Sequence, residues 1–236
     1  METVLQTFGL TKQYGGHRAL DKLTVQLPQG KIVGLLGPNG SGKTTFLKIC
    51  AGILTASAGQ VEICGQPVGV GTKSLVSYLP DRTYLSNGQK VRQQLDFFED
   101  FYPDFDRARA EKMLAALDID VDKRFGTLSK GTREKVQLVL VMSRRARLYL
   151  LDEPIGGVDP AARDYILNTI ITNYDPTATV LISTHLIADV EPVLDEFLFL
   201  HQGRVVGSGA VDAVREKEGK TLDELFREVF RCLPSF

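Results

Sequence analysis

The sequence predicts an α/β fold with a mostly parallel sheet, an N-terminal antiparallel β subdomain and an inserted helical lobe. Almost wholly apolar runs at 31–36 and 148–151 are typical of strands that are buried on both faces. Apolar and polar residues alternate at 23–27, as in a half-buried antiparallel strand. From about residue 84 the composition indicates helices, which suggests a lobe inserted between two parts of the core.

The composition fits one large globular domain. The chain has 236 residues, of which 43% are hydrophobic and 24% charged, as is ordinary for a soluble globular protein. We expect a single domain: 1–83 and 146–210 form the α/β core with its antiparallel subdomain, 84–145 the helical lobe, and 211–236 the C-terminal helices. The formal net charge of −1 gives no global attraction to nucleic acid, and no nucleic-acid partner is expected.

Cysteine usage and hydropathy favour a cytoplasmic protein. Cys50, Cys64 and Cys232 are too few and too scattered for a disulfide framework or a zinc site. The apolar surroundings of Cys50 and Cys64 predict core thiols. No run reaches the ~18 apolar residues of a membrane span, and the N-terminus lacks the features of a signal peptide. Any work at a membrane therefore requires spans from another chain.

The elements of the core follow from local patterns. Strands at 4–10 and 20–27 flank a turn at Tyr14-Gly15-Gly16. The strand at 31–36 leads through a Gly-rich turn into a helix that ends near Gly52. Two further strands follow, and Pro80 stops the second; they are expected at 60–64 and 74–79.

Three helices are expected in the lobe, and the core resumes after them. The first carries one apolar face, Asp106 caps the second, and the third spans roughly 133–145. After the strand at 148–151 we expect a helix at 160–173 with Pro160 in its first turn. The remaining elements are a strand at 178–183, a hairpin of 196–200 and 204–207, and a helix at 221–232.

A phosphate-binding loop joins the strand at 31–36 to its helix. The residues fit the pattern G-x-x-x-x-G-K-[ST] and are Gly37, Pro38, Asn39, Gly40, Ser41, Gly42, Lys43 and Thr44, with Thr45 next. Glycines let the backbone approach an anion, and N–H groups of the loop and helix point at it. Lys43 is expected to reach the β- and γ-phosphates, and Thr44 to ligate Mg²⁺. The alternative, a plain Gly-rich turn, does not explain the full pattern. The fold is thus predicted to be a P-loop NTPase core.

Two carboxylates follow the apolar strand at 148–151. In phosphate-loop NTPases an Asp at such a strand end holds Mg²⁺, and an adjacent Glu can polarise the attacking water. Asp152 and Glu153 fit these two roles. The alternative is an ordinary strand end with two solvated acids.

Together these motifs resemble those of the ATP-binding subunit of an ABC transporter, over nearly the whole chain. Gly37 to Thr44 resembles the Walker A loop, and Leu148 to Glu153 the Walker B strand. Leu128 to Thr132 resembles the family signature. Three further motifs follow the family's order: the D-loop at Gly157-Val158-Asp159, the switch histidine at His185 and the adenine-stacking aromatic at Tyr14. Taken singly, Tyr14 could be a strand-edge aromatic, His185 a structural histidine, and Ser129 with Gly131 a helix cap.

The resemblance implies an ATPase that binds ATP and Mg²⁺. Lys43, Glu153 and His185 would act in hydrolysis, and Thr44 and Asp152 would hold the metal. Ser129, Lys130 and Gly131 would meet ATP bound by a second ABC ATPase subunit, either a homodimer mate or a related cassette, and Asp159 would be the D-loop residue. The catalytic unit would then be a head-to-tail dimer with two composite sites.

Two positions depart from the family pattern. Lys130 and Thr132 stand where the signature usually has Gly and Gln. Asp81 stands where the Q-loop glutamine is expected, and its carboxylate could still contact Mg²⁺. These variations, with the segment at 101–106, resemble ABC-2-type bacterial exporters.

The leading hypothesis is therefore an ATPase subunit that lies on the cytoplasmic face of the membrane. It would power transport, by export, through separate membrane-spanning subunits. A rival is a soluble ABC ATPase that acts on ribosomes or DNA, but such proteins usually have two cassettes or a long coiled-coil insertion. A third reading, a regulatory subunit with little turnover, is kept open by Lys130 and Asp81.

Overall fold

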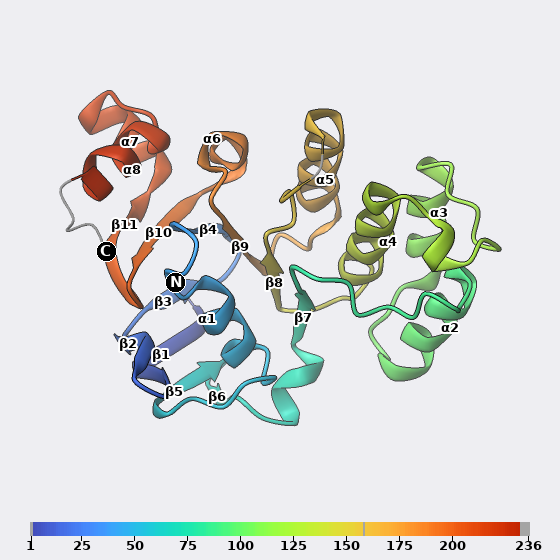
Figure 1. Cartoon of the computed structure of the whole chain (residues 1–236), viewed down its shortest axis with the longest axis horizontal. Helices are drawn as coiled ribbons and strands as arrows, with labels where there is room; N and C mark the ends of the chain where they lie inside the picture. Colours follow the sequence, from blue (N-terminus) through green and yellow to red (C-terminus); the bar gives the residue numbers. More distant parts are fainter. Residues whose placement is uncertain (1, 158, 232–236) are drawn as a thin grey trace.

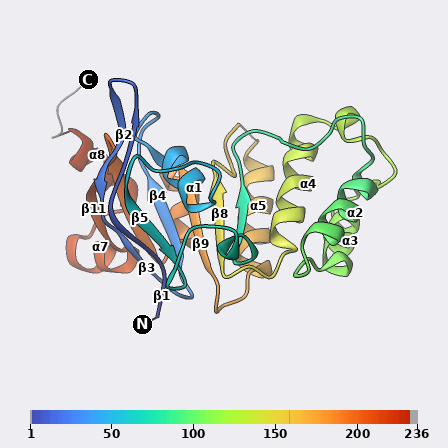
Figure 2. The ribbon, with the colours of Figure 1, turned by 90° about the horizontal axis from the view of Figure 1, so that it is seen from below.

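The computed structural model describes residues 2–157 and 159–231. Val158 of the expected D-loop and Cys232, at the end of the expected last helix, lie outside the described residues. Within these ranges the chain forms two sheets and a group of helices at one end (Figures 1 and 2). No described helix combines the length and the apolar character needed to cross a membrane.

The larger sheet is mostly parallel and holds six strands in the order β11-β10-β4-β9-β8-β7. All neighbouring pairs are parallel except β10 with β11. Its strands are β4 (Ile32–Leu36), β7 (Val76–Leu79), β8 (Leu148–Asp152), β9 (Thr179–Thr184), β10 (Glu196–His201) and β11 (Arg204–Ala210). The central strands β4, β8 and β9 are buried at every position, which explains their continuous apolar runs.

The smaller sheet is antiparallel and comes mainly from the N-terminus. Its order is β2-β1-β5-β6, and β3 also pairs with β1. The strands are β1 (Thr3–Tyr14), β2 (His17–Leu23), β3 (Gln26–Pro28), β5 (Ala58–Ile63) and β6 (Gln66–Pro67). The expected single strand at 20–27 is in fact divided into β2 and β3, with Thr24 and Val25 between them. At this break the Thr7 hydroxyl of β1 donates to the Leu23 carbonyl oxygen at 3.0 Å and accepts from Val25 N at 2.9 Å.

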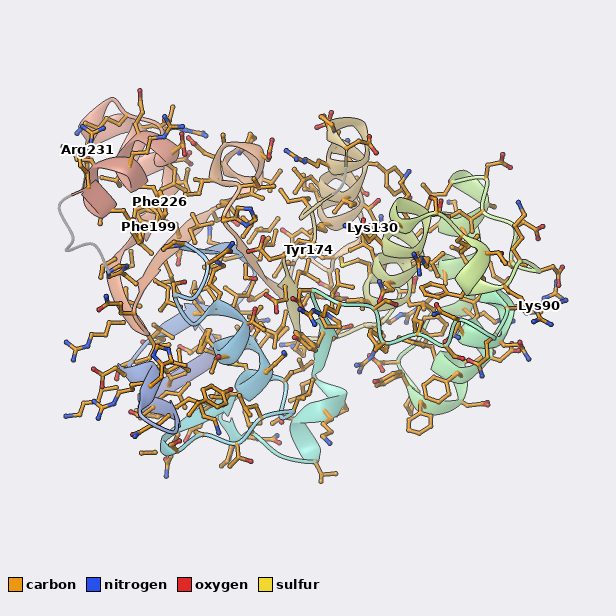
Figure 3. All side chains as sticks on the ribbon, in the orientation of Figure 1. Lys90, Lys130, Tyr174, Phe199, Phe226 and Arg231 are labelled. Atoms are coloured by element: carbon orange, nitrogen blue, oxygen red, sulfur yellow. The ribbon has the colours of Figure 1, made fainter. Side chains whose placement is uncertain are left out.

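Helices cover both faces of the parallel sheet. On one face α1 (Lys43–Cys50) packs with the antiparallel sheet over side chains such as Leu35 and Leu150. On the other face α5 (Pro160–Asn173) and α6 (Ile187–Val190) cover side chains such as Leu151. At the edge, α7 (Val211–Glu218) and α8 (Leu222–Arg231) follow β11, and Phe226 packs on Phe199 at 5.2 Å between ring centroids (Figure 3).

Three helices form the lobe beyond β7. They are α2 (Val91–Phe101), α3 (Arg107–Ala116) and α4 (Lys130–Met142). The Asp106 carboxylate accepts a hydrogen bond from Arg109 N, and so caps α3. The helix α4 begins three residues before the expected start at Arg133, because the Ser129 hydroxyl caps it by accepting from Thr132 N at 3.2 Å.

The expected strand at 74–79 is shorter, since Gly71–Ser74 forms a 3₁₀ turn before β7. Two other short 3₁₀ segments are Phe125–Thr127 and Glu191–Val193. Cys50 is buried as expected, but the prediction for Cys64 is wrong: its side chain is exposed in the turn between β5 and β6, where φ is 49°. The position of Cys64 in the turn exposes its side chain, although its sequence neighbours are apolar.

Candidate nucleotide-binding site

The phosphate loop connects β4 to α1 through two glycines that no other residue could replace without strain. Gly42 has φ of 109°, and a Cβ there would lie 2.5 Å from the carbonyl oxygen of Ala19 in β2. A Cβ on Gly37 would lie 2.3 Å from the carbonyl oxygen of Leu200 in β10. No side chain caps the N-terminus of α1, so its first N–H groups are available to an anion.

Lys43 is folded back over the loop that it follows. Its Nζ donates to the carbonyl oxygens of Gly37 at 2.7 Å and Pro38 at 3.3 Å, and lies 3.5 Å from Oε1 of Glu153. Burial lowers the pKa of Lys43, while the charges of Glu153 and Asp152 oppose that shift. These contacts hold a buried ammonium group where the resemblance places the phosphates.

Asp152, the last residue of β8, is 1% exposed. Its Oδ1 accepts hydrogen bonds from the Ser183 hydroxyl at 2.6 Å and the Thr44 hydroxyl at 3.1 Å. Burial raises the pKa of Asp152, the two hydroxyl hydrogen bonds lower it, and the charges of Asp81 and Glu153 raise it further. Its second oxygen, Oδ2, is buried without a hydrogen-bond partner among the described residues.

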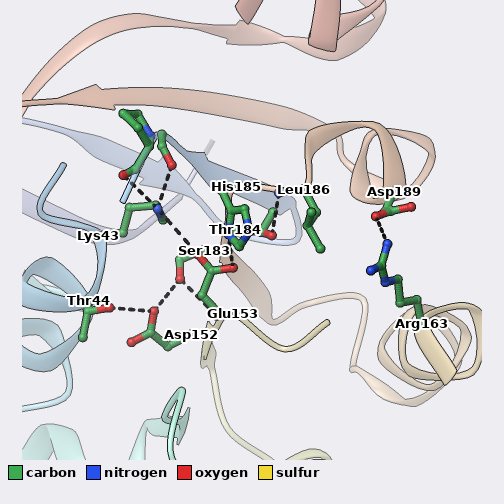
Figure 4. A network of polar contacts seen from close by, with 12 residues as sticks. Lys43, Thr44, Asp152, Glu153, Arg163, Ser183, Thr184, His185, Leu186 and Asp189 are labelled. Carbon is green, nitrogen blue, oxygen red and sulfur yellow. Dashed lines mark hydrogen bonds and ion pairs between the residues drawn. The ribbon is translucent and has the colours of Figure 1, made fainter. Parts of the chain in front are cut away.

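Glu153 and His185 face each other at the same edge of the sheet (Figure 4). Oε2 of Glu153 lies 3.0 Å from Nδ1 of His185, which follows β9 and is exposed. Glu153 has φ of 49°, and its N–H donates to the Ser183 carbonyl oxygen at 2.9 Å. This turn directs the Glu153 carboxylate towards Lys43 and His185 rather than along the strand.

Parallel pairing explains why these residues meet. The carboxyl ends of β4, β8 and β9 lie at one edge, and Asp152 is in register with Ser183. Ser183 had no expected role from the sequence. The signal for it is its position at the end of an apolar strand, one residue before Thr184-His185.

The residues present fit a magnesium–triphosphate group. Oxygen donors are the ligands that Mg²⁺ prefers, and Thr44 and Asp152 supply a hydroxyl and a carboxylate side by side. Buried polar atoms normally have partners, yet Oδ2 of Asp152 and Oγ of Ser41 have none among the described residues. Lys43 and the uncapped start of α1 supply the positive counterpart for phosphate.

The other predicted site residues lie outside this group. Asn39 and Gly40 are exposed at the tip of the loop, and Tyr14 is 48% exposed at the end of β1. Asp81 is exposed after β7, but it is near enough for its charge to raise the pKa of Asp152. Asp159 is exposed just before α5, where its carbonyl oxygen accepts from Arg163 N.

The signature residues at the start of α4 are also apart from the phosphate loop of the same chain. In both views α4 lies beyond β8 from α1 (Figures 1 and 2). Ser129 and Lys130 are exposed, and Lys130 Nζ lies 3.8 Å from Oε1 of Glu134. The side chain of Lys130 also reaches the D-loop, because a Cβ on Gly157 would lie 2.7 Å from Nζ.

The fold and the site define a phosphate-loop protein that binds a nucleoside triphosphate. Residues 20–156, more than half of the chain, match the sequence family described as ABC transporter. The chain therefore belongs to the ABC transporter family, as an ATP-binding subunit.

Individual relatives agree with this assignment. The chain is 32% identical over 158 residues to an uncharacterized ABC transporter ATP-binding protein, YhaQ, of Bacillus subtilis, and the match covers 64% of this chain and 52% of YhaQ. It is 28% identical to the daunorubicin resistance ATP-binding protein DrrA3 of Streptomyces coeruleorubidus, over 96% of this chain and 75% of DrrA3. For the first three curated relatives the match spans only 52%, 61% and 53% of their length.

Solved structures show the same fold. The structure of an ATP-binding subunit of an ABC transporter superposes with a TM-score of 0.84 at 28% identity, covering 96% of this chain and 99% of that one.

Proposed function

We propose that this chain hydrolyses ATP to power transport, by export, through separate membrane-spanning subunits on whose cytoplasmic side it lies. The observation that carries the proposal is the meeting of Lys43, Asp152 and Glu153 at one sheet edge, with Thr44 and His185 beside them. The relative DrrA3 is named for daunorubicin resistance, which is compatible with the export that the resemblance to ABC-2-type exporters implies.

The chain's own groups suggest how hydrolysis would proceed. Lys43 would exchange its carbonyl contacts for the β- and γ-phosphates, and Thr44 and Asp152 would hold Mg²⁺. The bound ion would neutralise charge that develops on the phosphates. Glu153 would orient the attacking water and accept its proton, and His185 would steady the γ-phosphate through the ring nitrogen that does not face Glu153.

A second subunit would complete each site. The N-terminus of α4 carries a helix dipole, the exposed Ser129 and Lys130 and the half-buried Gly131, and α4 lies on the other side of β8 from α1. We infer that they close on ATP held by the second subunit, with Asp159 of the D-loop at the same interface. Tyr14 would stack on the adenine, and Asp81 would contact Mg²⁺.

A groove between the core and the lobe is the surface at which we expect a membrane subunit to bind. It has a volume of ≈ 730 Å³ and is lined by apolar and aromatic side chains such as Ile53, Tyr84 and Phe101. Its charged lining residues are the cations Lys48, Lys73, Arg82 and Arg144 and the carboxylates Asp81 and Asp104. Ile53, Tyr84 and Phe101 are 64%, 50% and 66% exposed. Such a surface fits a cytoplasmic helix of the membrane subunit that presents apolar residues and a carboxylate.

Glu153→Gln tests the function most directly. We expect steady ATP hydrolysis to fall at least a hundredfold, because general-base catalysis contributes roughly 10²–10⁴-fold. ATP binding should persist, and the mass in solution should become that of a dimer with MgATP. Glu216→Gln on the exposed face of α7 is the matched control, and Lys43→Ala should lose nucleotide binding.

Each result has a defined meaning. Hydrolysis at the wild-type rate in Glu153→Gln would overturn the assigned role of Glu153. A wild-type chain that dimerises with ATP but does not turn it over would instead support the regulatory subunit.

A further inference from the structure

Tyr78 in β7 lies on the same sheet face as the proposed magnesium carboxylate. It pairs with Leu150 of the neighbouring strand β8, and Asp152 follows Leu150 by two residues. Because side chains alternate along a strand, Leu150 and Asp152 point to one face. Tyr78 packs with Leu150 and the α1 side chains on that face, where Thr44 of α1 contacts Asp152.

Two polar atoms in this region are buried without partners among the described residues. They are the hydroxyl oxygen of Tyr78 and Oδ2 of Asp152. Burial raises the pKa of Tyr78, and the charges of Asp152 and Asp81 and the acceptor oxygen of Asp152 raise it further. The phenol and the carboxylate thus lie on one face of neighbouring strands, each with a polar atom that forms no hydrogen bond among the described residues. A buried phenol donor normally has an acceptor.

The Tyr78 ring also reaches the partner groove. It lines the groove together with Lys48, Pro80, Asp81 and Tyr84. Tyr78 is therefore in contact with both the groove and the surroundings of Asp152. Asp81 follows the same strand but, as an ionised carboxylate, can only accept hydrogen bonds, so it cannot donate to Asp152.

We propose that Tyr78 is a positioning residue for the metal site, whose hydroxyl donates a hydrogen bond to Oδ2 of Asp152 when MgATP is bound. This inference rests on the proposed function of the site. The carboxylate has lone pairs enough to accept from Tyr78, Thr44 and Ser183 while it also holds the ion or a water of its shell. Closure of the gap between Tyr78 and Asp152 would move the groove wall, and so link the metal to the partner surface.

Tyr78→Phe removes the hydroxyl alone and tests the proposal. The measurement is the equilibrium affinity for ATP, once with Mg²⁺ and once with the metal chelated, together with the thermal midpoint of the nucleotide-free chain. We expect the gain in affinity caused by Mg²⁺ to fall about tenfold, the scale of removing a group that orients a metal ligand. Affinity without the metal should not change.

The nucleotide-free midpoint separates positioning from damage to the fold. Because the hydroxyl has no hydrogen-bond partner among the described residues, its removal should leave the midpoint unchanged or higher. Tyr84→Phe is the matched control, since Tyr84 lines the same groove and should keep the full magnesium response.

Three results would overturn the proposal: an unchanged magnesium response in Tyr78→Phe, an equal loss of affinity with and without Mg²⁺, or the same loss in Tyr84→Phe. A wild-type chain whose ATP affinity does not respond to Mg²⁺ would contradict the proposed function itself. That outcome is distinct, because it is seen before any substitution is made.

Discussion

At the scale of single residues, a buried charge in the site lowers the stability of the fold. Asp152 has a raised pKa, so its proton stabilises the fold below the ordinary value of 3.8, and that contribution is lost as pH rises through the raised value. At pH 7 its charge is therefore a cost, and the unpartnered Oδ2 adds to it.

Asp152→Asn should accordingly stabilise the nucleotide-free chain at pH 7, by about 1 kcal/mol. The gain should shrink as the pH falls through the raised pKa of Asp152. The same variant should lose the increase in thermal midpoint that MgATP gives the wild type. Thermal unfolding across this pH range, with the exposed Asp100→Asn as control, checks both effects. A variant less stable than the wild type at pH 7 would contradict the assignment of cost to this carboxylate.

At the scale of elements, two helix caps of similar geometry should differ in function. The hydroxyl of Ser129 caps α4, and the carboxylate of Asp106 caps α3. Loss of either cap, as Ser129→Ala or Asp106→Ala, should destabilise the chain by about 1 kcal/mol. Only Ser129→Ala should also weaken ATP-dependent dimerisation, measured on the Glu153→Gln background. Equal dimerisation in the two variants would show that Ser129 is a cap and nothing more.

Local pattern predicted most elements, because phosphate-loop, capping and buried-strand signals act over a few neighbouring residues. The confirmed fold class depended on them. The break at Thr24-Val25 and the exposure of Cys64 were not predictable in this way. The first involves contacts with the Thr7 hydroxyl on another strand, and the second a left-handed turn residue. Contacts of Ser183 with Asp152, and the approach of Tyr78, depend on strand order in the sheet. The local patterns of one sequence do not define the order of the strands in the sheet.

At the scale of the whole molecule, Arg144 joins the helical lobe to the core. It follows α4 and is 3% exposed. Its Nη1 donates to the Val76 carbonyl oxygen at 2.7 Å, and its Nη2 to that of Ser74 at 3.2 Å, both in the core. On the lobe side, its Nε donates to both Asp104 oxygens at 3.2 Å, and its guanidinium lies 3.9 Å from the centre of the Tyr102 ring. One side chain thus fixes how the groove walls face each other.

Arg144→Met should destabilise the chain by about 3 kcal/mol, because it leaves the Asp104 carboxylate and two carbonyl oxygens without their partner. The adjacent Arg145→Met is the matched control: its pair with Asp106 is exposed, so its loss should cost less than about 1 kcal/mol. Adding Asp104→Asn to Arg144→Met should recover part of the loss, since the unpaired charge is then gone. Denaturant unfolding of the wild type and these three variants measures the differences. Equal losses of unfolding free energy in Arg144→Met and Arg145→Met would show that the burial of Arg144 does not govern the attachment of the lobe to the core.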